Sequence, residues 1–196
     1  GNSLITLYEP ATKTVQPLGM VEGVSLVKLF TSEQHEQYAV SSLGALYMLT
    51  GATAQHVCAP MGATAFYGFH GSVIWIEKDG FIRALDPVSC TLVPTPIASF
   101  ACGAEGAVLN NVLYCVSSTE VTSVDAGGVV TPIGSHAPFS AGFKVFTRGG
   151  SLRVLELSSE GAILTVDTQN GSVISSGETF AFYVTPFSWY PSSSSS

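Results

Sequence analysis

Short runs of apolar residues alternate with turn-forming residues along the whole chain. In a typical unit, residues 72–76 lead into Lys78-Asp79-Gly80, and residues 81–85 follow. Runs of this length are typical of β-strands, and Asp-Gly between two apolar runs is a strong hairpin signal. The pattern therefore predicts short antiparallel hairpins. The same layout recurs at 112–116 with 121–124 and at 152–157 with 162–166.

A two-part motif recurs with a period of about 40 residues, which is in the range of one propeller blade. Its first half is an apolar residue, an acidic or polar residue, and then Pro or a small residue: Leu7-Tyr8-Glu9-Pro10, Leu49-Thr50-Gly51, Leu85-Asp86-Pro87, Val124-Asp125-Ala126 and Val166-Asp167-Thr168. Its second half is mostly Pro, an apolar residue and Gly: Pro17-Leu18-Gly19, Pro60-Met61-Gly62, Pro96-Ile97-Ala98, Pro132-Ile133-Gly134 and a decayed Ser175-Ser176-Gly177.

The repeat predicts an all-β fold, a β-propeller of five blades with four short antiparallel strands each. Residues 1–190 form one domain, and 191–196 are a Ser-rich tail. The fifth blade combines both ends of the chain, because pairing of N- and C-terminal strands leaves no open sheet edge. It is one strand short unless 188–190 supplies the strand; otherwise it has three strands, or the chain is a piece of a longer one. The predicted blades are 20–62, 63–98, 99–134, 135–177, and 178–190 with 1–19.

Aromatic and small residues open each repeat, and small residues suit the crowded innermost strand of a blade. Each repeat is therefore expected to run from the innermost strand to the outermost. Residues 24–37 fit a helix loosely, but a strand over 26–30 followed by a loop is favoured. The opening segments are Phe66-Tyr67-Gly68, 100–103, 139–142 and 180–183.

The Asp86-Pro87 turn and the hairpin layout resemble β-propeller repeat families of the kelch, WD40 and quinoprotein-like kind. The resemblance covers nearly the whole chain, at the level of pattern. The Trp-Asp and Gly-His signatures of WD40 repeats are absent, and the double glycines Gly127-Gly128 and Gly149-Gly150 are out of phase with kelch repeats. The resemblance implies a propeller that serves as an interaction platform, and it carries over no catalytic residue.

Composition and charge narrow the possible partners. The chain is 46% apolar and 11% charged, with a formal net charge of −7 and seven scattered Lys and Arg residues. Nucleic acids and anionic membrane surfaces require clustered basic residues, so neither is expected as a partner. No apolar run approaches the roughly 18 residues of a membrane span, and no signal peptide is visible. Membrane insertion is not expected.

The four cysteines, Cys58, Cys90, Cys102 and Cys115, form no Cys-x-x-Cys pair, and no two histidines have metal-binding spacing. A metal site is therefore not expected, and no sequence motif indicates a cofactor. Three of these cysteines lie among apolar or small neighbours, where a reduced thiol behaves as a small hydrophobe. The sequence is interpreted as having reduced core cysteines, which favours a cytoplasmic or nuclear location.

Catalytic motifs are missing from the sequence. There is no Gly-x-Ser-x-Gly nucleophile elbow and no phosphate-binding loop. Asp86, Asp125 and Asp167 hold equivalent places in the repeat, which indicates turn capping. Glu105 is then the one carboxylate expected near the centre, and glycoside hydrolysis requires a pair. The protein is therefore predicted not to be an enzyme.

The favoured function is a non-enzymatic protein-interaction or scaffold domain. The hairpin tips and the loops that link blades lie on one face, which is where many propellers bind partners. The alternatives are a glycan- or small-ligand-binding propeller, a phosphopeptide-binding module of the polo-box type, and a glycoside hydrolase. The candidate partner-binding residues are Lys78, Asp79, Thr119, Glu120, Ser159 and Glu160 at the tips, His136 in a linking loop, and Trp189 near the C-terminus.

Overall fold

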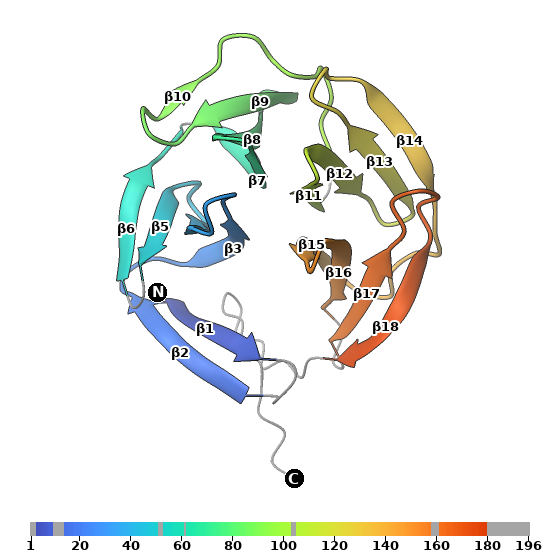
Figure 1. Cartoon of the computed structure of the whole chain (residues 1–196), viewed down its shortest axis with the longest axis horizontal. Helices are drawn as coiled ribbons and strands as arrows, with labels where there is room; N and C mark the ends of the chain where they lie inside the picture. Colours follow the sequence, from blue (N-terminus) through green and yellow to red (C-terminus); the bar gives the residue numbers. More distant parts are fainter. Residues whose placement is uncertain are drawn as a thin grey trace.

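The computed structural model of the chain describes residues 3–9, 14–50, 53–60, 62–102, 105–157 and 161–179. These residues form eighteen β-strands, and no helix occurs among them. Four four-stranded antiparallel sheets stand around a common centre, and a two-stranded sheet lies beside the first of them (Figure 1). The fold is a β-propeller, as predicted from the repeat of short strands.

We number the four-stranded blades 1 to 4 in chain order. Blade 1 contains β3 (Leu26–Thr31), β4 (Gln37–Ser41), β5 (Leu46–Thr50) and β6 (Thr53–Cys58). Blade 2 contains β7 (Ala63–His70), β8 (Val73–Lys78), β9 (Phe81–Asp86) and β10 (Thr91–Leu92). Blade 3 contains β11 (Glu105–Leu109), β12 (Val112–Val116), β13 (Glu120–Val124) and β14 (Val130–Ser135). Blade 4 contains β15 (Phe143–Arg148), β16 (Ser151–Glu156), β17 (Ala162–Val166) and β18 (Val173–Thr179). The two-stranded sheet pairs β1 (Ser3–Glu9) with β2 (Thr14–Val21).

The predicted count of five blades is wrong: the described residues form four complete blades, and the fifth sheet has two described strands. The closing strand was expected within 178–190. Glu178 and Thr179 instead extend β18, where they pair with Ile163 and Ala162 beyond a β-bulge. Residues 180–190, with Trp189, and the 191–196 tail lie outside the described residues.

The first strand of each blade is the innermost, as predicted (Figure 1). Strand β7 lies against both β3 and β11, and β11 also lies against β15. The prediction of a strand over 26–30 is confirmed by β3. The opening aromatic segment lies within the inner strand only in blade 2; Phe100 and Phe139 precede β11 and β15, because longer segments link these blades.

The outer strand of each blade joins its neighbour in one repeated register. A fully buried aliphatic residue of the third strand pairs with a residue at the end of the outer segment, and in three of the blades a β-bulge follows at once. Cys58 thus holds the structural place of Ala98 and Gly134, and the predicted motif half at Pro60 lies beyond β6. The pairs are Leu46 with Cys58, Ile82 with Ala98, Val121 with Gly134, and Ile163 with Glu178.

The hydrophobic core consists of layers between successive blades. Strand β8 shows how the alternation of side chains builds two layers at once. Ile74 and Ile76 pack towards blade 1, whereas Trp75 packs towards blade 3, and all three are at most 2% exposed. Full burial of such side chains contributes about 1.5–3 kcal/mol each, so contacts between blades are a major source of stability.

In blades 2 to 4, the turns between the third and fourth strands are capped by aspartates, as predicted. Asp86 Oδ1 accepts a hydrogen bond from the Val88 amide at 2.9 Å, and Asp167 Oδ1 accepts one from the Gln169 amide at 2.8 Å. Asp125 Oδ1 accepts two, from the amides two and four residues later, both at 2.9 Å. The hydrogen bond from the Ser89 hydroxyl, with that of the Val88 amide, lowers the pKa of Asp86.

Two cysteines that were predicted to be reduced form a disulfide. Cys102, just before β11, is bonded to Cys115 in β12, and their Cα atoms are 5.2 Å apart. Cys58 is a buried thiol and Cys90 an exposed one. The expectation of a cytoplasmic or nuclear location depended on four reduced thiols, so that argument no longer holds.

Candidate functional site: the central cavity

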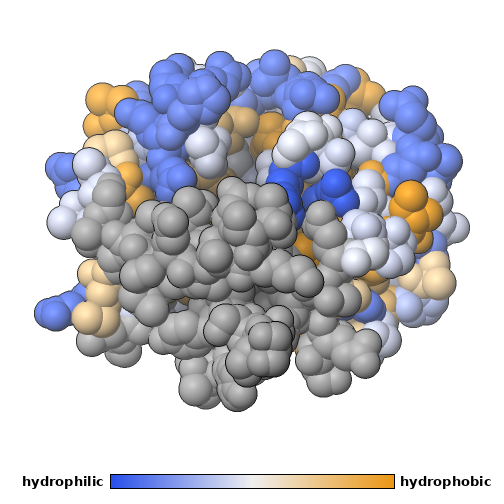
Figure 2. Space-filling view, turned by 60° about the horizontal axis from the view of Figure 1, so that its bottom comes forward, coloured by the Kyte–Doolittle hydropathy of each residue, from blue (hydrophilic) through white to orange (hydrophobic). Residues whose placement is uncertain are grey.

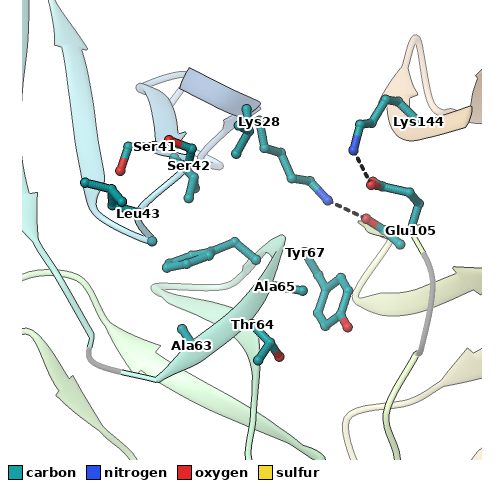
Figure 3. Close-up of a pocket in the computed structure, with 15 residues that line it drawn as sticks. Lys28, Ser41, Ser42, Leu43, Ala63, Thr64, Ala65, Tyr67, Glu105 and Lys144 are labelled. Carbon is teal, nitrogen blue, oxygen red and sulfur yellow. Dashed lines mark hydrogen bonds and ion pairs between the residues drawn. The ribbon is translucent and has the colours of Figure 1, made fainter. Parts of the chain in front are cut away.

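A cavity of about 360 Å³ lies where the first residues of the innermost strands meet. It is lined by residues of β3, β7, β11 and β15 and by the turn between β4 and β5. Figure 3 shows Lys28, Glu105 and Lys144 on one side of it and the 41–43 segment on the other. We call it the central cavity. It combines charged groups from three blades with Leu43, which is 93% exposed at the rim.

Lys28 reaches across the centre of the ring. Alternate side chains of β3 are covered, and Lys28 falls on the covered side together with Leu26 and Phe30. Its Nζ donates a hydrogen bond to the carbonyl of Gly106 in β11, at 2.6 Å, and lies 5.6 Å from the ring centroid of Tyr67. Burial lowers the pKa of Lys28 to about 8, although the negative charge of Glu105 opposes this shift.

Glu105 and Lys144 form an ion pair between blades 3 and 4. Lys144 Nζ lies 2.5 Å from Glu105 Oε1, and the side chains are 38% and 27% exposed (Figure 3). Glu105 begins β11 and Lys144 is the second residue of β15, so the geometry follows from the convergence of the inner strands. The expectation that Glu105 lies near the centre is confirmed, and its charge is neutralised by a lysine.

Tyr67 forms a rigid wall of the cavity. Its side chain is 2% exposed, and its hydroxyl donates to Glu77 Oε2 at 2.5 Å. The same carboxylate oxygen accepts a hydrogen bond from the Cys102 amide at 3.0 Å. Burial, followed by the hydrogen bond to Glu77, raises the pKa of Tyr67. Tyr67 is therefore a neutral hydroxyl whose proton is held by Glu77.

The charges of the lining favour an anion. Lys28 and Lys144 supply two ammonium groups, and Glu105 is the one carboxylate among the described lining residues. The lining therefore has a net charge of one positive unit when both lysines are protonated. In the described ranges, no group of three or more His, Cys, Asp and Glu residues is arranged to hold a metal ion.

The sequence-predicted residues that the structure describes do not line the cavity. Lys78 and Asp79 lie at the β8–β9 turn, with Lys78 partly covered and Asp79 exposed. The second strand of a blade runs back along the first, so the turn that follows it lies beside the residue where the first strand begins. Ala63, the first residue of β7, accordingly pairs with Lys78. The tips and the central cavity therefore share one face of the ring. In the described part of the surface that Figure 2 shows, hydrophilic residues are mixed with scattered apolar ones.

The structure brings two of the predicted residues together. The His136 amide donates to the Thr119 carbonyl at 2.8 Å, and the His136 ring lies 4.6 Å from that of Phe139. Glu120 is exposed, and its amide donates to the Ser117 hydroxyl. The other three predicted residues, Ser159, Glu160 and Trp189, lie outside the described residues.

Sequence reasoning missed Lys28, Lys144 and Leu43 as site residues. A signal for the lysines was present, because each interrupts an apolar inner strand: Val27-Lys28-Leu29 and Phe143-Lys144-Val145. A charged residue at such a position points either to solvent or to the centre of the ring. Only the three-dimensional arrangement shows that both lysines approach the same cavity.

Comparisons with known proteins support the fold. No protein family matches the sequence, and no curated protein matches it either. Among solved structures, a candidate gluconolactonase is 12% identical with a TM-score of 0.54, over 94% of this chain and 82% of that one. A likeness at this identity shows the propeller fold alone.

Two further solved structures are less similar. BamB from Moraxella catarrhalis is 19% identical with a TM-score of 0.40, over 82% of this chain. YCF48 bound to D1 peptide is 10% identical with a TM-score of 0.49, over 78% of this chain. The chain spans about half the length of each, 51% and 53% respectively. No helix long and apolar enough to cross a membrane occurs in the described part of the chain.

Proposed function

We propose that this propeller is a non-enzymatic domain that binds a protein partner on the face that contains the central cavity. The observation that supports this most strongly is the convergence of Lys28 and Lys144, from blades 1 and 4, on one cavity of about 360 Å³. The exposed side chain of Leu43 at the rim offers an apolar contact next to this charge. The hairpin tips around the cavity provide the polar rim that protein interfaces typically have.

The partner is expected to insert an acidic side chain. Its carboxylate would receive hydrogen bonds from the ammonium groups of Lys28 and Lys144, and such charge-assisted bonds are stronger than neutral ones. The chain carries a net charge of −7, but charges more than about 8 Å away are largely screened at physiological ionic strength. The local positive charge of the cavity therefore decides which group enters.

A hydrolytic function is not favoured by this lining. Glycoside hydrolysis requires two carboxylates at a defined separation, which act as acid and base or as acid and nucleophile. Glu105 is already paired with Lys144, and Glu77 accepts its hydrogen bonds from Tyr67 and Cys102 behind the cavity wall. Both carboxylates are thus already engaged in structural contacts, which suits binding better than proton transfer.

A small anionic ligand is the second candidate. The cavity volume lies at the lower end of the roughly 300–1,000 Å³ of small-molecule sites. A metabolite with one carboxylate or phosphate group would meet the same two lysines. The two candidates differ in whether the hairpin tips contribute to affinity, because a small ligand does not reach them.

Affinity capture from cell lysate followed by binding measurements tests the proposal. The wild-type chain is compared with Lys28→Met, which keeps the length of the side chain and removes its charge, and with Asp79→Ala/Glu120→Ala at the tips. The captured partner's acidic segment is then synthesised with its acidic residue intact or replaced by the amide. We expect Lys28→Met and the amide each to weaken binding about tenfold or more.

The pH dependence of binding provides an internal check. The affinity of the acidic peptide is expected to fall as the pH rises through about 8, because Lys28 loses its charge there. Equal affinity of the acidic and amide peptides for the wild-type chain would contradict the proposal. The small-ligand function would be favoured if the wild-type chain bound a metabolite and no protein. In that case Lys28→Met should lose the metabolite, and the tip variant should bind it as the wild type does.

A further inference from the structure

Blades 2 and 3, and likewise blades 3 and 4, meet through the same contact at the rim of the ring. The aspartate-capped turn of one blade rests against the end of the preceding blade's outer segment. Between blades 2 and 3, Gly128 lies so close to the Ile97 carbonyl that a Cβ at Gly128 would overlap it. Between blades 3 and 4, a Cβ at Gly171 would lie 2.8 Å from backbone atoms of Gly134. We call this the turn–strand contact.

The left-handed residue of each turn makes this contact. Gly128 has a φ of 79° and Gly171 a φ of 74°. In blade 2 the corresponding turn residue is Cys90, four residues after Asp86, with a φ of 55°. Non-glycine residues seldom adopt this conformation, except for Asn and Asp. A cysteine therefore stands where the other two turns use glycine.

At the interface between blades 1 and 2, the end of the outer strand that would receive the turn also has a cysteine, Cys58. The register places Cys58 in blade 1 where Ala98 and Gly134 stand in blades 2 and 3. Cys58 is packed with Leu85 of β9, and Leu92 of β10 lies against the same cluster, so both neighbours of the Cys90 turn adjoin it. The two thiols are also close enough for Cys90 to influence the titration of Cys58.

We propose that Cys58 and Cys90 are a second disulfide site, which links the outer strand of blade 1 covalently to the turn of blade 2. The proposal follows from the repeated turn–strand contact, which brings the equivalent backbone positions together in the other interfaces. It is independent of the function proposed above, because neither cysteine lines the central cavity.

Oxidation requires a partner that accepts two electrons, and a low-molecular-weight disulfide such as oxidised glutathione is the class proposed. The Cys90 thiolate attacks one sulfur of that disulfide, forms a mixed disulfide and releases one thiolate. The Cys58 thiolate then attacks the Cys90 sulfur and releases the second. Two protein thiols are thereby oxidised to one disulfide, one small disulfide is reduced to two thiols, and the protons of Cys58 and Cys90 pass to the released thiolates.

The exposure of the two thiols assigns their roles. Cys90 is exposed and meets the oxidant, whereas Cys58 is 3% exposed and can meet only Cys90. Burial raises the pKa of Cys58 to about 12, and the neighbouring Cys90 and Asp86 add to this shift. The closing step is therefore expected to be the slow one, because the fraction of Cys58 thiolate is small at neutral pH.

Treatment of the folded full chain with oxidised glutathione tests the proposal. When the treated protein is then denatured, we expect neither thiol to react with an alkylating maleimide. A proteolytic fragment pair joined through Cys58 and Cys90 should appear, about 2 Da lighter than the sum of its reduced parts. Cys58→Ser should stop at a glutathione adduct on Cys90. Cys90→Ser should leave Cys58 unmodified.

The Cys102–Cys115 disulfide is an internal control for folding, since it should be found in each variant. The cross-linked protein should also melt a few degrees above Cys58→Ser/Cys90→Ser, because a disulfide restricts the unfolded chain. Wild-type protein that stops at the Cys90 adduct would overturn the proposal. So would a cross-link between two chains through Cys90 in place of the internal one.

Discussion

At the residue scale, the unusual group is the amine of Lys28, which is buried among other side chains. Lys28 exchanges hydration for one hydrogen bond to a carbonyl and for proximity to an aromatic face. These contacts do not fully replace water, so its pKa falls from 10.5 to about 8. The protonated amine is thus a cost to the folded state, and such a cost is typical of residues kept for binding.

The cost of Lys28 predicts a pH dependence of stability. Between pH 8 and 10.5 the unfolded chain keeps a proton on Lys28 that the folded chain has lost, so the free energy of unfolding rises with pH in this window. Relative to Lys28→Met, the wild-type chain should gain about 1–3 kcal/mol between pH 7.5 and pH 10. Urea unfolding at the two pH values measures this difference.

Lys78→Met serves as the control, because it removes a lysine outside the central cavity. Its stability relative to the wild type should change little over the same pH range. A wild-type chain that loses stability relative to Lys28→Met as the pH rises would show that the Lys28 ammonium is favourably paired in the folded state, which is the opposite of what its burial implies.

At the element scale, the sequence predicted the hairpins and the capped turns. Alternating apolar runs and Asp-Gly or Asp-Pro turns are local signals, so β8, β9 and the Asp86 turn could be predicted from neighbouring residues alone. The disulfide between Cys102 and Cys115 could not, because it depends on how the segment before β11 returns along β12. For the same reason, the proximity of Lys28 and Lys144 at the central cavity could not be predicted from neighbouring residues.

The capped turns predict a local loss of stability. Asp125→Ala removes the acceptor of two backbone N–H groups, from Gly127 and Val129. We expect the free energy of unfolding to fall by about 1 kcal/mol, because the amides must then bind water in a less ordered turn. Chemical denaturation measures the change, with Glu22→Ala, at an exposed position, as the control. Equal effects of the two substitutions would show that the cap contributes nothing.

At the scale of the whole molecule, stability resides between blades. Each layer of the core takes side chains from two neighbouring sheets, so no single blade has a core of its own. The sequence period predicted the propeller and its four complete blades, but the total of five was wrong for the described residues. Blade number depends on how the two ends of the chain meet, and no local pattern encodes that meeting.

The turn–strand contact predicts an effect at the interface between blades 3 and 4. A Cβ at Gly134 would overlap the Asn170 carbonyl, whereas one at Gly142 would lie 3.7 Å from a Leu157 methyl group, an ordinary contact. Gly134→Ala should therefore lower the free energy of unfolding by about 1–3 kcal/mol, and Gly142→Ala should change it little. Calorimetry and denaturant unfolding distinguish the two; a stable Gly134→Ala would mean that the blades separate easily.

The turn–strand contact also bears on how such a ring could arise and change. In the described residues, blade 3 carries both parts of the contact: its turn rests on blade 2, and the end of its outer strand receives the turn of blade 4. A gene segment copied in tandem would therefore bring both halves of its own joint, and the new blade could enter the ring without redesign of its neighbours. At Cys58 and Cys90 a cysteine stands where the other two contacts have small residues, so a duplicated unit with these two residues would bring thiol chemistry to its contact without a change in the backbone.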